Sequence, residues 1–396
     1  MGNYKRPADH KEVVLLSTAD WDNPFWTNKQ HVAMEFARRG YQVLYIDSLG
    51  LRRPSLSSRD MRRMLRRLVK AARPPRKVRE NIWVWSPIML PFHGVPMVRR
   101  LNRWLLKAGL AVWTRVHGMR NAMLWTYNPL SMELIDLRGW SQVVYHCVDE
   151  IKAQPGMPVE ILERAEEVLV KRADVVFVTS TTLEVSRRAL NPCTHYLPNV
   201  ADFDHFSRAM DDSITVPADL LAIRGPRIGF IGAISGYKQD FELLCEVADQ
   251  HPEWSLVLIG EVGEGDPWTD ASMLARRTNV HLLGPRPYGD LPAYLKGMDV
   301  AMLPNRINEY TAAMFPMKFF EYLAAGRPVV SVNLPSLRAY ADTVCLSHSA
   351  DEFMQGIANA LEGRSAPLEQ RLSLARQNTY SARMDRMIEI VAGLAL

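Results

Sequence analysis

The chain has 396 residues, enough for two domains that each have a full hydrophobic core. Its hydrophobic content of 47% and charged content of 23% are those of a soluble globular protein, and no apolar run approaches the ~18–20 residues of a membrane-spanning helix. The four cysteines lie far apart and match no metal or redox spacing, which favours a reducing compartment. The apolar run 13–16 is too short for a signal-peptide core, so we expect a cytoplasmic protein.

The net charge of +5 conceals a strong segregation of charge along the chain. Residues 52–120 contain 18 of the 48 basic residues and only two of the 43 acidic ones, Asp60 and Glu80. This segment therefore carries a net charge of +16, and the rest of the chain carries −11. A basic segment of this strength predicts an anionic partner.

Apolar runs typical of strands alternate with helical patterns, which predicts a doubly wound α/β architecture. In the first half the expected strands are 13–17, 43–47, 82–85, 122–126, 143–147 and 175–179, with a loop and a short extended piece over 191–199. In the second half they are 227–232, 255–259, 280–283, 300–303 and 328–332. The polar, turn-rich stretch 202–224 predicts a linker, so we expect Rossmann-like domains over 1–208 and 224–380, followed by a helix over 381–396.

The most specific pattern of the chain lies within residues 310–331. Pro316 opens a short amphipathic helix, Gly326 ends it, and the last expected strand follows. Free N–H groups at the start of such a helix suit a phosphate. Lys318 adds a positive charge in the first turn, and Glu321 can accept hydrogen bonds from a ribose diol. The spacing predicts a nucleotide-binding segment.

From Pro316 on, the pattern Pro-x-Lys-x-x-Glu-Tyr-Leu-Ala-Ala-Gly-x-Pro-Val-Val resembles the donor-binding signature of GT-B glycosyltransferases. It is most similar to bacterial family 4-like enzymes of surface-polysaccharide synthesis, including the teichuronic-acid type. The resemblance implies two Rossmann-like domains facing across a cleft, with the last helix packed back on the N-terminal domain. It also implies that Glu321 holds the donor ribose. The family's first glutamate, which contacts the sugar, is replaced here by Ala313, so the pattern does not indicate which sugar is carried.

Further donor-binding candidates follow the expected strands of the second half. Glycines at the end of strand 227–232 allow backbone to approach a phosphate, and Lys238 matches the basic residue that neutralises the diphosphate in the family. Arg286 and Tyr288 lie in the loop that contacts the nucleotide base in relatives. We assign donor binding to Gly232, Ser235, Lys238, Gly260, Arg286, Lys318, Phe319 and Glu321.

The N-terminal domain of such enzymes receives the acceptor. Two of its loops, 20–26 and 145–150, combine aromatic rings that stack on sugars with carboxylates that bind hydroxyls. Asp149 is the first candidate for a catalytic acid, ahead of Asp20 and His146, although an aspartate after a strand is also a common helix cap. The resemblance favours a retaining reaction in which the leaving diphosphate takes the acceptor proton; an inverting reaction would use Asp149 as base. No Asp-x-Asp motif is present, so we predict no metal and no cofactor beyond the donor.

Two amphipathic helices are expected in the basic segment, over 58–72 and 97–112. If their apolar faces pack on the domain's own sheet, the basic faces are simply solvated, but this leaves the charge of +16 without a role. An anionic membrane, a nucleic acid or an acidic polysaccharide could be the partner. Because no nucleic-acid fold accompanies the charge and surface-polysaccharide enzymes act on lipid carriers, we expect peripheral contact with the inner face of the membrane and no nucleic-acid binding.

Together these features predict a glycosyltransferase that moves a sugar from a nucleoside-diphosphate donor to a lipid-linked or polysaccharide acceptor. A nucleotide-sugar 2-epimerase shares the fold and remains an alternative. A non-catalytic nucleotide-sugar-binding protein is the other, because of Ala313. Release of nucleotide that depends on an acceptor separates the first reading from both alternatives.

Overall fold

The computed structural model describes residues 11–23, 26–49, 74–90, 96–119, 121–266 and 268–394. The chain divides into two compact units. Unit 1 takes in the chain up to Val178, Leu183–Leu197 and the C-terminal residues from Met384; unit 2 takes in Thr179–Thr182 and Pro198–Arg383. The helix expected over 58–72 lies outside the described residues.

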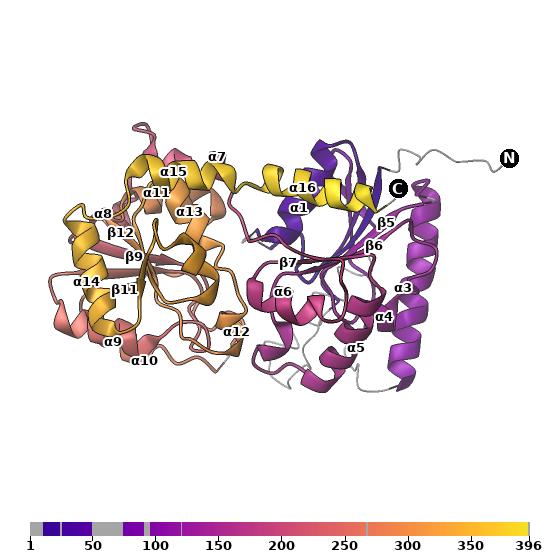
Figure 1. The fold of residues 1–396 in the computed structure, drawn as a ribbon, viewed down its shortest axis with the longest axis horizontal. Helices are drawn as coiled ribbons and strands as arrows, with labels where there is room; N and C mark the ends of the chain where they lie inside the picture. Colours follow the sequence, from indigo (N-terminus) through magenta and orange to yellow (C-terminus); the bar gives the residue numbers. More distant parts are fainter. Residues whose placement is uncertain are drawn as a thin grey trace. The chain divides into compact units, whose positions relative to one another are not determined.

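Unit 1 is built on an eight-stranded sheet with the order β3-β4-β2-β1-β5-β6-β7-β8 (Figure 1). Its strands are β1 (Glu12–Leu16), β2 (Gln42–Ile46), β3 (Arg76–Arg79), β4 (Ile82–Trp85), β5 (Met123–Thr126), β6 (Val143–Cys147), β7 (Val175–Val178) and β8 (Thr194–Tyr196). Every neighbouring pair is parallel except β3 and β4. The central strands are mostly apolar and almost fully buried, as expected for a parallel sheet whose two faces are both covered by helices.

The α-helices of unit 1 are α1 (Asn28–Arg38), α3 (Pro96–Val116), α4 (Ser131–Leu134), α5 (Val159–Arg172) and α6 (Thr181–Arg188), with a 3₁₀ turn at η1 (Ile151–Ala153). The last helix, α16 (Tyr380–Gly393), begins in unit 2 and continues in unit 1. Its buried residues Met384, Met387 and Val391 join the same core cluster as Phe36 of α1. The C-terminal helix thus completes one face of the unit 1 core.

Unit 2 is built on a six-stranded sheet with the order β11-β10-β9-β12-β13-β14 and only parallel pairs. The strands are β9 (Arg227–Ile231), β10 (Ser255–Ile259), β11 (Val280–Leu282), β12 (Val300–Leu303), β13 (Val329–Val332) and β14 (Cys345–Ser347). Its α-helices are α7 (Phe203–Ser207), α8 (Ala218–Leu221), α9 (Phe241–Gln250), α10 (Ser272–Ala275), α11 (Leu291–Lys296), α12 (Glu309–Ala312), α13 (Lys318–Ala324), α14 (Ala350–Leu361) and α15 (Leu368–Gln377). The 3₁₀ turns are η2 (Arg208–Met210), η3 (Tyr288–Asp290) and η4 (Pro335–Tyr340). Core clusters cover both faces of this sheet.

Two features of the fold differ from the expectations. The division between the units falls after Leu197 rather than after residue 208, because Phe206 and Ala209 pack in the core of unit 2. The strands β3 and β14 were not expected, whereas β8 lies within the loop and short extended piece expected over 191–199. Both unexpected strands lie at sheet edges and are short, and β3 has the polar sequence RKVR, so they lack the apolar run that marks a buried strand.

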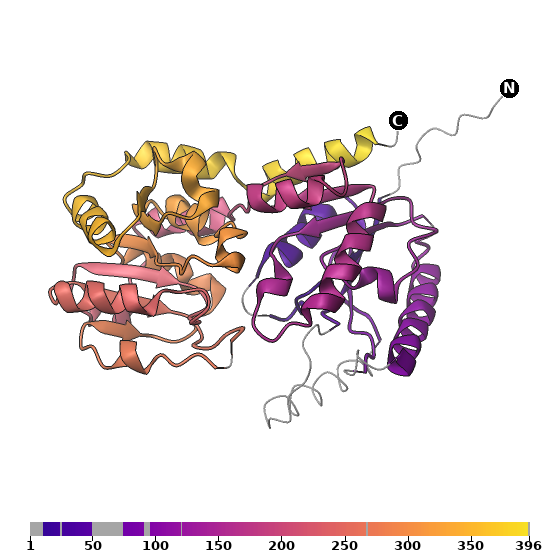
Figure 2. The ribbon, with the colours of Figure 1, turned by 60° about the horizontal axis from the view of Figure 1, so that its bottom comes forward.

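Across the described ranges, no helix has both the length and the apolar character needed to cross a bilayer. Helix α3, the longest of the described helices, runs along the surface of unit 1 (Figure 1 and Figure 2).

Candidate nucleotide-binding site

The strand order of unit 2 reverses beside β9. The chain runs outward from β9 through β10 to β11 and then returns to place β12 on the other side of β9. In open parallel sheets, ligands bind at the carboxyl ends of the strands at such a reversal. The β9 loop (232–240) and the β12 loop (304–308) begin there, and a backbone bridge between Gln239 and Asn305 joins them. This edge of unit 2 is therefore the candidate site.

Two glycines hold the ends of β9 and β10 close together. A Cβ atom at Gly260 would lie 1.8 Å from the carbonyl oxygen of Gly232, a backbone atom that cannot move aside. Gly260 also has a φ of +154°, a conformation that side chains with a Cβ rarely adopt. Glycine at 260 thus fixes where the β9 loop starts.

Helix α13 is attached directly to the end of β9. The backbone N–H of Ile231 donates to the Tyr322 hydroxyl at 2.8 Å, deep in the core. Phe319 is fully buried and packs against Phe315 and Tyr340. Its side chain thus belongs to the core of unit 2, and the structure gives it no exposed surface for the donor contact that the sequence suggested. Its burial fixes the orientation of α13 instead.

That orientation places Lys318 and Glu321 together on the other side of the helix. The Lys318 ammonium lies 2.6 Å from the Glu321 carboxylate, which is buried. A buried carboxylate paired with one lysine retains lone pairs for further donors, such as the two hydroxyls of a ribose. Because α13 has only seven residues, we attribute the positive potential here to Lys318 rather than to the helix.

The β9 loop brings a second lysine to this edge. The half-buried Lys238 has its ammonium over the rings of Tyr237 and Tyr310, 5.3 and 5.4 Å from their centroids. Its backbone carbonyl accepts hydrogen bonds from the Arg306 N–H and the Asn305 side-chain amide. The loop is therefore held in place by the β12 loop.

Three buried polar atoms in these two loops have no hydrogen-bond partner among the described residues. They are Oγ of Ser235, Oε1 of Gln239 and Oδ1 of Asn305. A buried polar group without a partner costs free energy, so such a group is uncommon unless a ligand completes it. Ser235 was a sequence candidate. Gln239 and Asn305 were not, because neither belongs to the signature pattern and only the fold brings them together.

The segment before α13 is held by four side chains from distant parts of unit 2. Consecutive backbone carbonyls accept hydrogen bonds from hydroxyl or amide groups: Ala312 from Thr182, Ala313 from Ser180, Met314 from Ser336 and Phe315 from Asn199. Ala313 itself is buried, so the position of the family's first glutamate carries neither charge nor exposed surface here. The four bonds nevertheless fix the backbone at this point.

Glu264, in the loop after β10, is an acidic residue that the sequence analysis did not consider. Burial raises the pKa of its carboxyl, while Lys238 and Lys318 act to lower it. The influence of both lysines places this carboxylate at the same edge as the candidate site. No motif singles it out, and only the three-dimensional arrangement identifies it.

The two base-contact candidates have different surroundings. Arg286 donates to the Tyr294 hydroxyl at 2.6 Å and to the Asp219 carboxylate at 2.8 Å, so contacts within unit 2 already occupy its guanidinium. Tyr288 instead stacks on the His205 ring, with centroids 4.2 Å apart, and burial followed by the charge of Glu321 raises the pKa of its hydroxyl. Tyr288 therefore lies closer than Arg286 to the environment of Glu321.

In unit 1 the strand order reverses between β1 and β5. Asp20 lies in the loop after β1 and is half-buried, whereas Asp149 follows β6. Strand β5 separates β1 from β6, so the two loops start about 10 Å apart, which is two strand spacings. The position of the reversal favours Asp20 over Asp149 as the acidic residue nearest a ligand at this edge.

His146, the third catalytic candidate, is fully buried on β6. Its ring lies 4.8 Å from that of Tyr127 and also contacts Trp125 and Phe177. These contacts are those of a core histidine. Trp21 is likewise buried, and its backbone N–H donates to the Asp47 carboxylate, so Trp26 is the more exposed of the two tryptophans of the 20–26 loop.

A buried ion cluster lies next to Asp149. The Arg187 guanidinium lies 2.7 Å from Glu150 and 2.9 Å from Glu166. The Tyr145 hydroxyl also donates to Glu166 at 2.7 Å. Burial acts to lower the pKa of Arg187, but the nearby negative charges outweigh it and raise that pKa. The cluster anchors the loop that carries Asp149.

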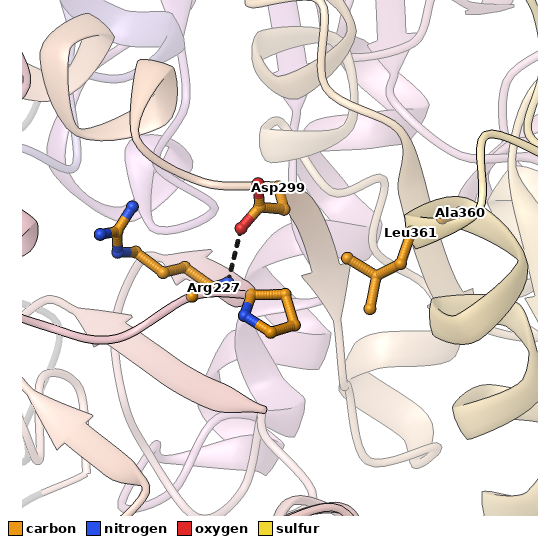
Figure 3. A pocket seen from close by; sticks show the side chains of 6 residues that line it. Arg227, Asp299, Ala360 and Leu361 are labelled. Carbon is orange, nitrogen blue, oxygen red and sulfur yellow. Dashed lines mark hydrogen bonds between the residues drawn. The ribbon is translucent and has the colours of Figure 1, made fainter. Parts of the chain in front are cut away.

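A hollow of about 540 Å³ lies at the opposite edge of the unit 2 sheet. Figure 3 shows Arg227 and Asp299 on one side of it and Ala360 and Leu361 on the other. Arg227 starts β9 and its backbone N–H donates to the Asp299 carboxylate at 2.7 Å. Because ligands of such sheets bind at the carboxyl ends of the strands, this hollow is separate from the candidate site.

Comparison with known proteins also identifies unit 2, which carries the candidate site. Residues 225–363 match the family model Glycosyl transferases group 1. Over 229 residues, which are 54% of this chain, the sequence is 34% identical to TuaH of Bacillus subtilis (strain 168), described as a teichuronic acid biosynthesis glycosyltransferase. The match spans 56% of the length of that curated relative.

Solved structures resemble nearly the whole chain. The sucrose-phosphate synthase of Thermosynechococcus elongatus has a TM-score of 0.69 at 17% identity, covering 97% of this chain and 98% of its own. Anabaena HepE in complex with UDP has a TM-score of 0.65 at 13% identity, covering 96% and 99%. WaaG, a glycosyltransferase involved in lipopolysaccharide biosynthesis, has a TM-score of 0.64 at 13% identity, covering 96% and 100%. At these identities the likeness concerns the fold.

The expected fold class is thus confirmed: the chain has two Rossmann-like units in the GT-B arrangement of its structural neighbours, and its residues 225–363 match the model of the glycosyl transferases group 1 family.

Proposed function

We propose that this protein is a glycosyltransferase that moves a sugar from a nucleoside-diphosphate donor to a lipid-linked or polysaccharide acceptor in surface-polysaccharide synthesis. The observation that carries the proposal is the ion pair between the half-buried Lys318 and the buried Glu321, which lies at the strand reversal of unit 2 and inside the matched region. The relative named for teichuronic acid synthesis and the structural neighbour named for lipopolysaccharide synthesis support the acceptor class. Neighbours solved with UDP and UDP-glucose support a UDP donor.

In this proposal the residues of unit 2 bind and orient the donor. Glu321 accepts hydrogen bonds from the ribose, and Lys238 and Lys318 balance the charge of the diphosphate. Ser235, with its unpartnered hydroxyl, donates to a phosphate oxygen or a donor hydroxyl. Gly232 and Gly260 keep the backbone close enough for these contacts.

The chemistry is the exchange of one bond at the anomeric carbon. The bond from that carbon to the diphosphate oxygen breaks, and a new bond forms to the acceptor hydroxyl oxygen. In a retaining reaction, the proton of the hydroxyl passes to the leaving diphosphate, whose charge the lysines stabilise. In an inverting reaction, an acidic residue of unit 1 takes the proton, for which Asp20 and Asp149 are the candidates. We propose the retaining course, without a metal ion.

The proposed acceptor determines the cellular location of the enzyme. A lipid-linked acceptor requires contact with a membrane, and we place the protein at the cytoplasmic face, held by the basic segment 52–120. The finding that no described helix could span a bilayer is compatible with peripheral contact.

The test is nucleotide release from UDP-glucose and from other UDP-sugars, with and without a membrane-lipid extract. We expect UDP release that depends on the extract and is lost in Glu321→Gln, which keeps the side-chain volume but not the charge. Conversion of the UDP-sugar without the extract would instead indicate an epimerase. Donor binding without release or conversion under any condition would indicate a non-catalytic binding protein.

A further inference from the structure

Helix α3 (Pro96–Val116) exposes a long apolar stripe. The exposed fractions of its large apolar side chains are 78% for Met97, 43% for Leu101, 64% for Trp104, 55% for Val112 and 65% for Val116. These positions lie three, four or eight residues apart, so they share one face over about 28 Å of helix. Elsewhere among the described residues, exposed apolar side chains of this size are spread over several elements.

The opposite face of α3 is anchored in unit 1. Leu106 and Leu110 are buried, and the buried Asn102 side chain bonds the N–H and the carbonyl of Leu90 at 2.8 and 2.9 Å. A Cβ at Gly109 would lie 2.3 Å from the Trp85 ring, so the helix packs as closely as its backbone allows. The helix therefore cannot rotate to bury the stripe.

The structure shows that the apolar face expected to pack on the sheet in helix 97–112 is instead exposed. The core side of the helix is made by Asn102, Leu106 and Leu110, roughly opposite Trp104 on the helical wheel. Periodicity alone cannot distinguish these two apolar stripes, because α3 is apolar over most of its circumference. The structure determines which stripe is exposed.

The exposed stripe is bordered by positive charge. Arg100 and Lys107 lie four residues before and three residues after Trp104, so their side chains flank it, and Arg115 lies near the C-terminal end. Helix α3 contains no aspartate or glutamate. A shallow hollow of about 320 Å³ continues the surface from Lys107 toward Trp140.

Charge decides between the partners that could cover such a stripe. A second copy of α3 would bring like charges together, and so would residues 52–73 of the same chain, which contain nine basic residues and one acidic residue. An anionic leaflet offers opposite charge and an apolar interior. Helices with an apolar face, a basic border and tryptophan lie in the plane of such an interface.

We propose that α3 docks this protein on an anionic membrane, with Met97, Leu101, Trp104 and Val112 inserted among the acyl chains and Arg100 and Lys107 at the phosphates. This assigns the membrane contact of the proposed function to one helix face, but the contact needs no donor or acceptor and is tested without them.

The test is sedimentation of the full chain with vesicles of phosphatidylcholine alone or with phosphatidylglycerol added. The wild type binds the anionic vesicles and not the neutral ones. Trp104→Glu lowers the fraction bound at least about tenfold, since a carboxylate is repelled by the leaflet and resists insertion. Val185→Glu, at a position 75% exposed on α6, is the matched control and binds like the wild type. Equal thermal unfolding of the two variants excludes misfolding.

Three results would overturn the proposal. The first is absence of wild-type binding to anionic vesicles. The second is wild-type binding by Trp104→Glu, which would assign any membrane contact to another surface. The third is a change from dimer to monomer in Trp104→Glu without a change in vesicle binding, which would identify a second copy as the partner. None of these results depends on glycosyl transfer, so the proposed function can fail or stand separately.

Discussion

Two clusters of buried polar groups, one in each unit, differ in how completely they are paired. In unit 1, the buried Arg187 guanidinium is bonded to the carboxylates of both Glu150 and Glu166. In unit 2, Ser235, Gln239 and Asn305 each keep a buried polar atom that no other described residue bonds. Satisfied polar groups stabilise a fold, whereas unsatisfied ones are available to a ligand. The comparison supports the proposed donor site in unit 2 and indicates a structural role for the ion cluster of unit 1.

The largest effect is expected from breaking the buried ion cluster of Arg187, Glu150 and Glu166. Arg187→Ala leaves Glu150 and Glu166 buried without their counter-charge, so we expect the free energy of unfolding to fall by about 3–5 kcal/mol. Denaturant unfolding followed by circular dichroism measures it. Lys171→Ala is the control, because its exposed pair with Glu167 contributes only about 0–1 kcal/mol. Equal stability of the two variants would contradict the structural role of the cluster.

The next largest effect is expected from a substitution at Gly260, where the end of β10 lies against the end of β9. In Gly260→Ala the new methyl group meets the Gly232 carbonyl, so we expect a loss of about 2–3 kcal/mol in unfolding free energy and weaker nucleotide binding. Gly289→Ala adds its methyl to open space and should change neither quantity by more than about 0.5 kcal/mol. A fully stable Gly260→Ala protein would show that the two loops are further apart than described.

The Ser235→Ala variant tests whether the Ser235 hydroxyl binds a ligand or stabilises the fold. Removing an unpartnered buried hydroxyl should leave the free protein as stable as the wild type or more stable by about 1 kcal/mol. Nucleotide binding, measured by calorimetric titration, should weaken by a similar free energy. A destabilised variant with unchanged affinity would place the hydroxyl in the fold and not in the site.

The smallest expected effect depends on pH. Because burial raises the pKa of Glu264 above its ordinary value of 4.5, its ionised form is disfavoured in the folded state. The stability gained by holding the proton is present below pH 4.5 and is lost as the pH rises through the raised pKa. Glu264→Gln should therefore raise the melting temperature at neutral pH, and the gain should vanish below pH 4.5. A gain that is constant with pH would contradict this origin.

The α/β architecture and the signature segment could be predicted from the sequence, because valine-rich runs and the Pro316–Gly326 helix signals are local. The inner strands β4 and β6 have the expected bounds. Gln239, Asn305 and Glu264 could not be found in this way, since their proximity arises from strands that are distant in sequence. For Phe319, a helix pattern indicates an apolar position but not whether that position lines a site or the core.

The face of α3 that is exposed was also beyond sequence reasoning. The helix has apolar residues on both its inner and outer sides, and only the Trp85–Gly109 contact and the Asn102 bonds select the inner one. The basic residues that border the stripe could be identified from the sequence alone, because counting charged residues does not require knowledge of their contacts. Edge strands such as β14 lack a distinctive pattern for a similar reason: half of their surroundings is solvent.

The most direct measurement is the thermal stability of the wild type and of Glu321→Gln in the presence of UDP, GDP, ADP or dTDP. One nucleotide at ~100 times its dissociation constant should add about 2.7 kcal/mol to the wild type. This gain should be absent in Glu321→Gln and present in the surface control Glu246→Ala. If no nucleotide stabilises the wild type, or if Glu321→Gln responds as the wild type does, the edge of unit 2 at β9 and β12 is not a donor site.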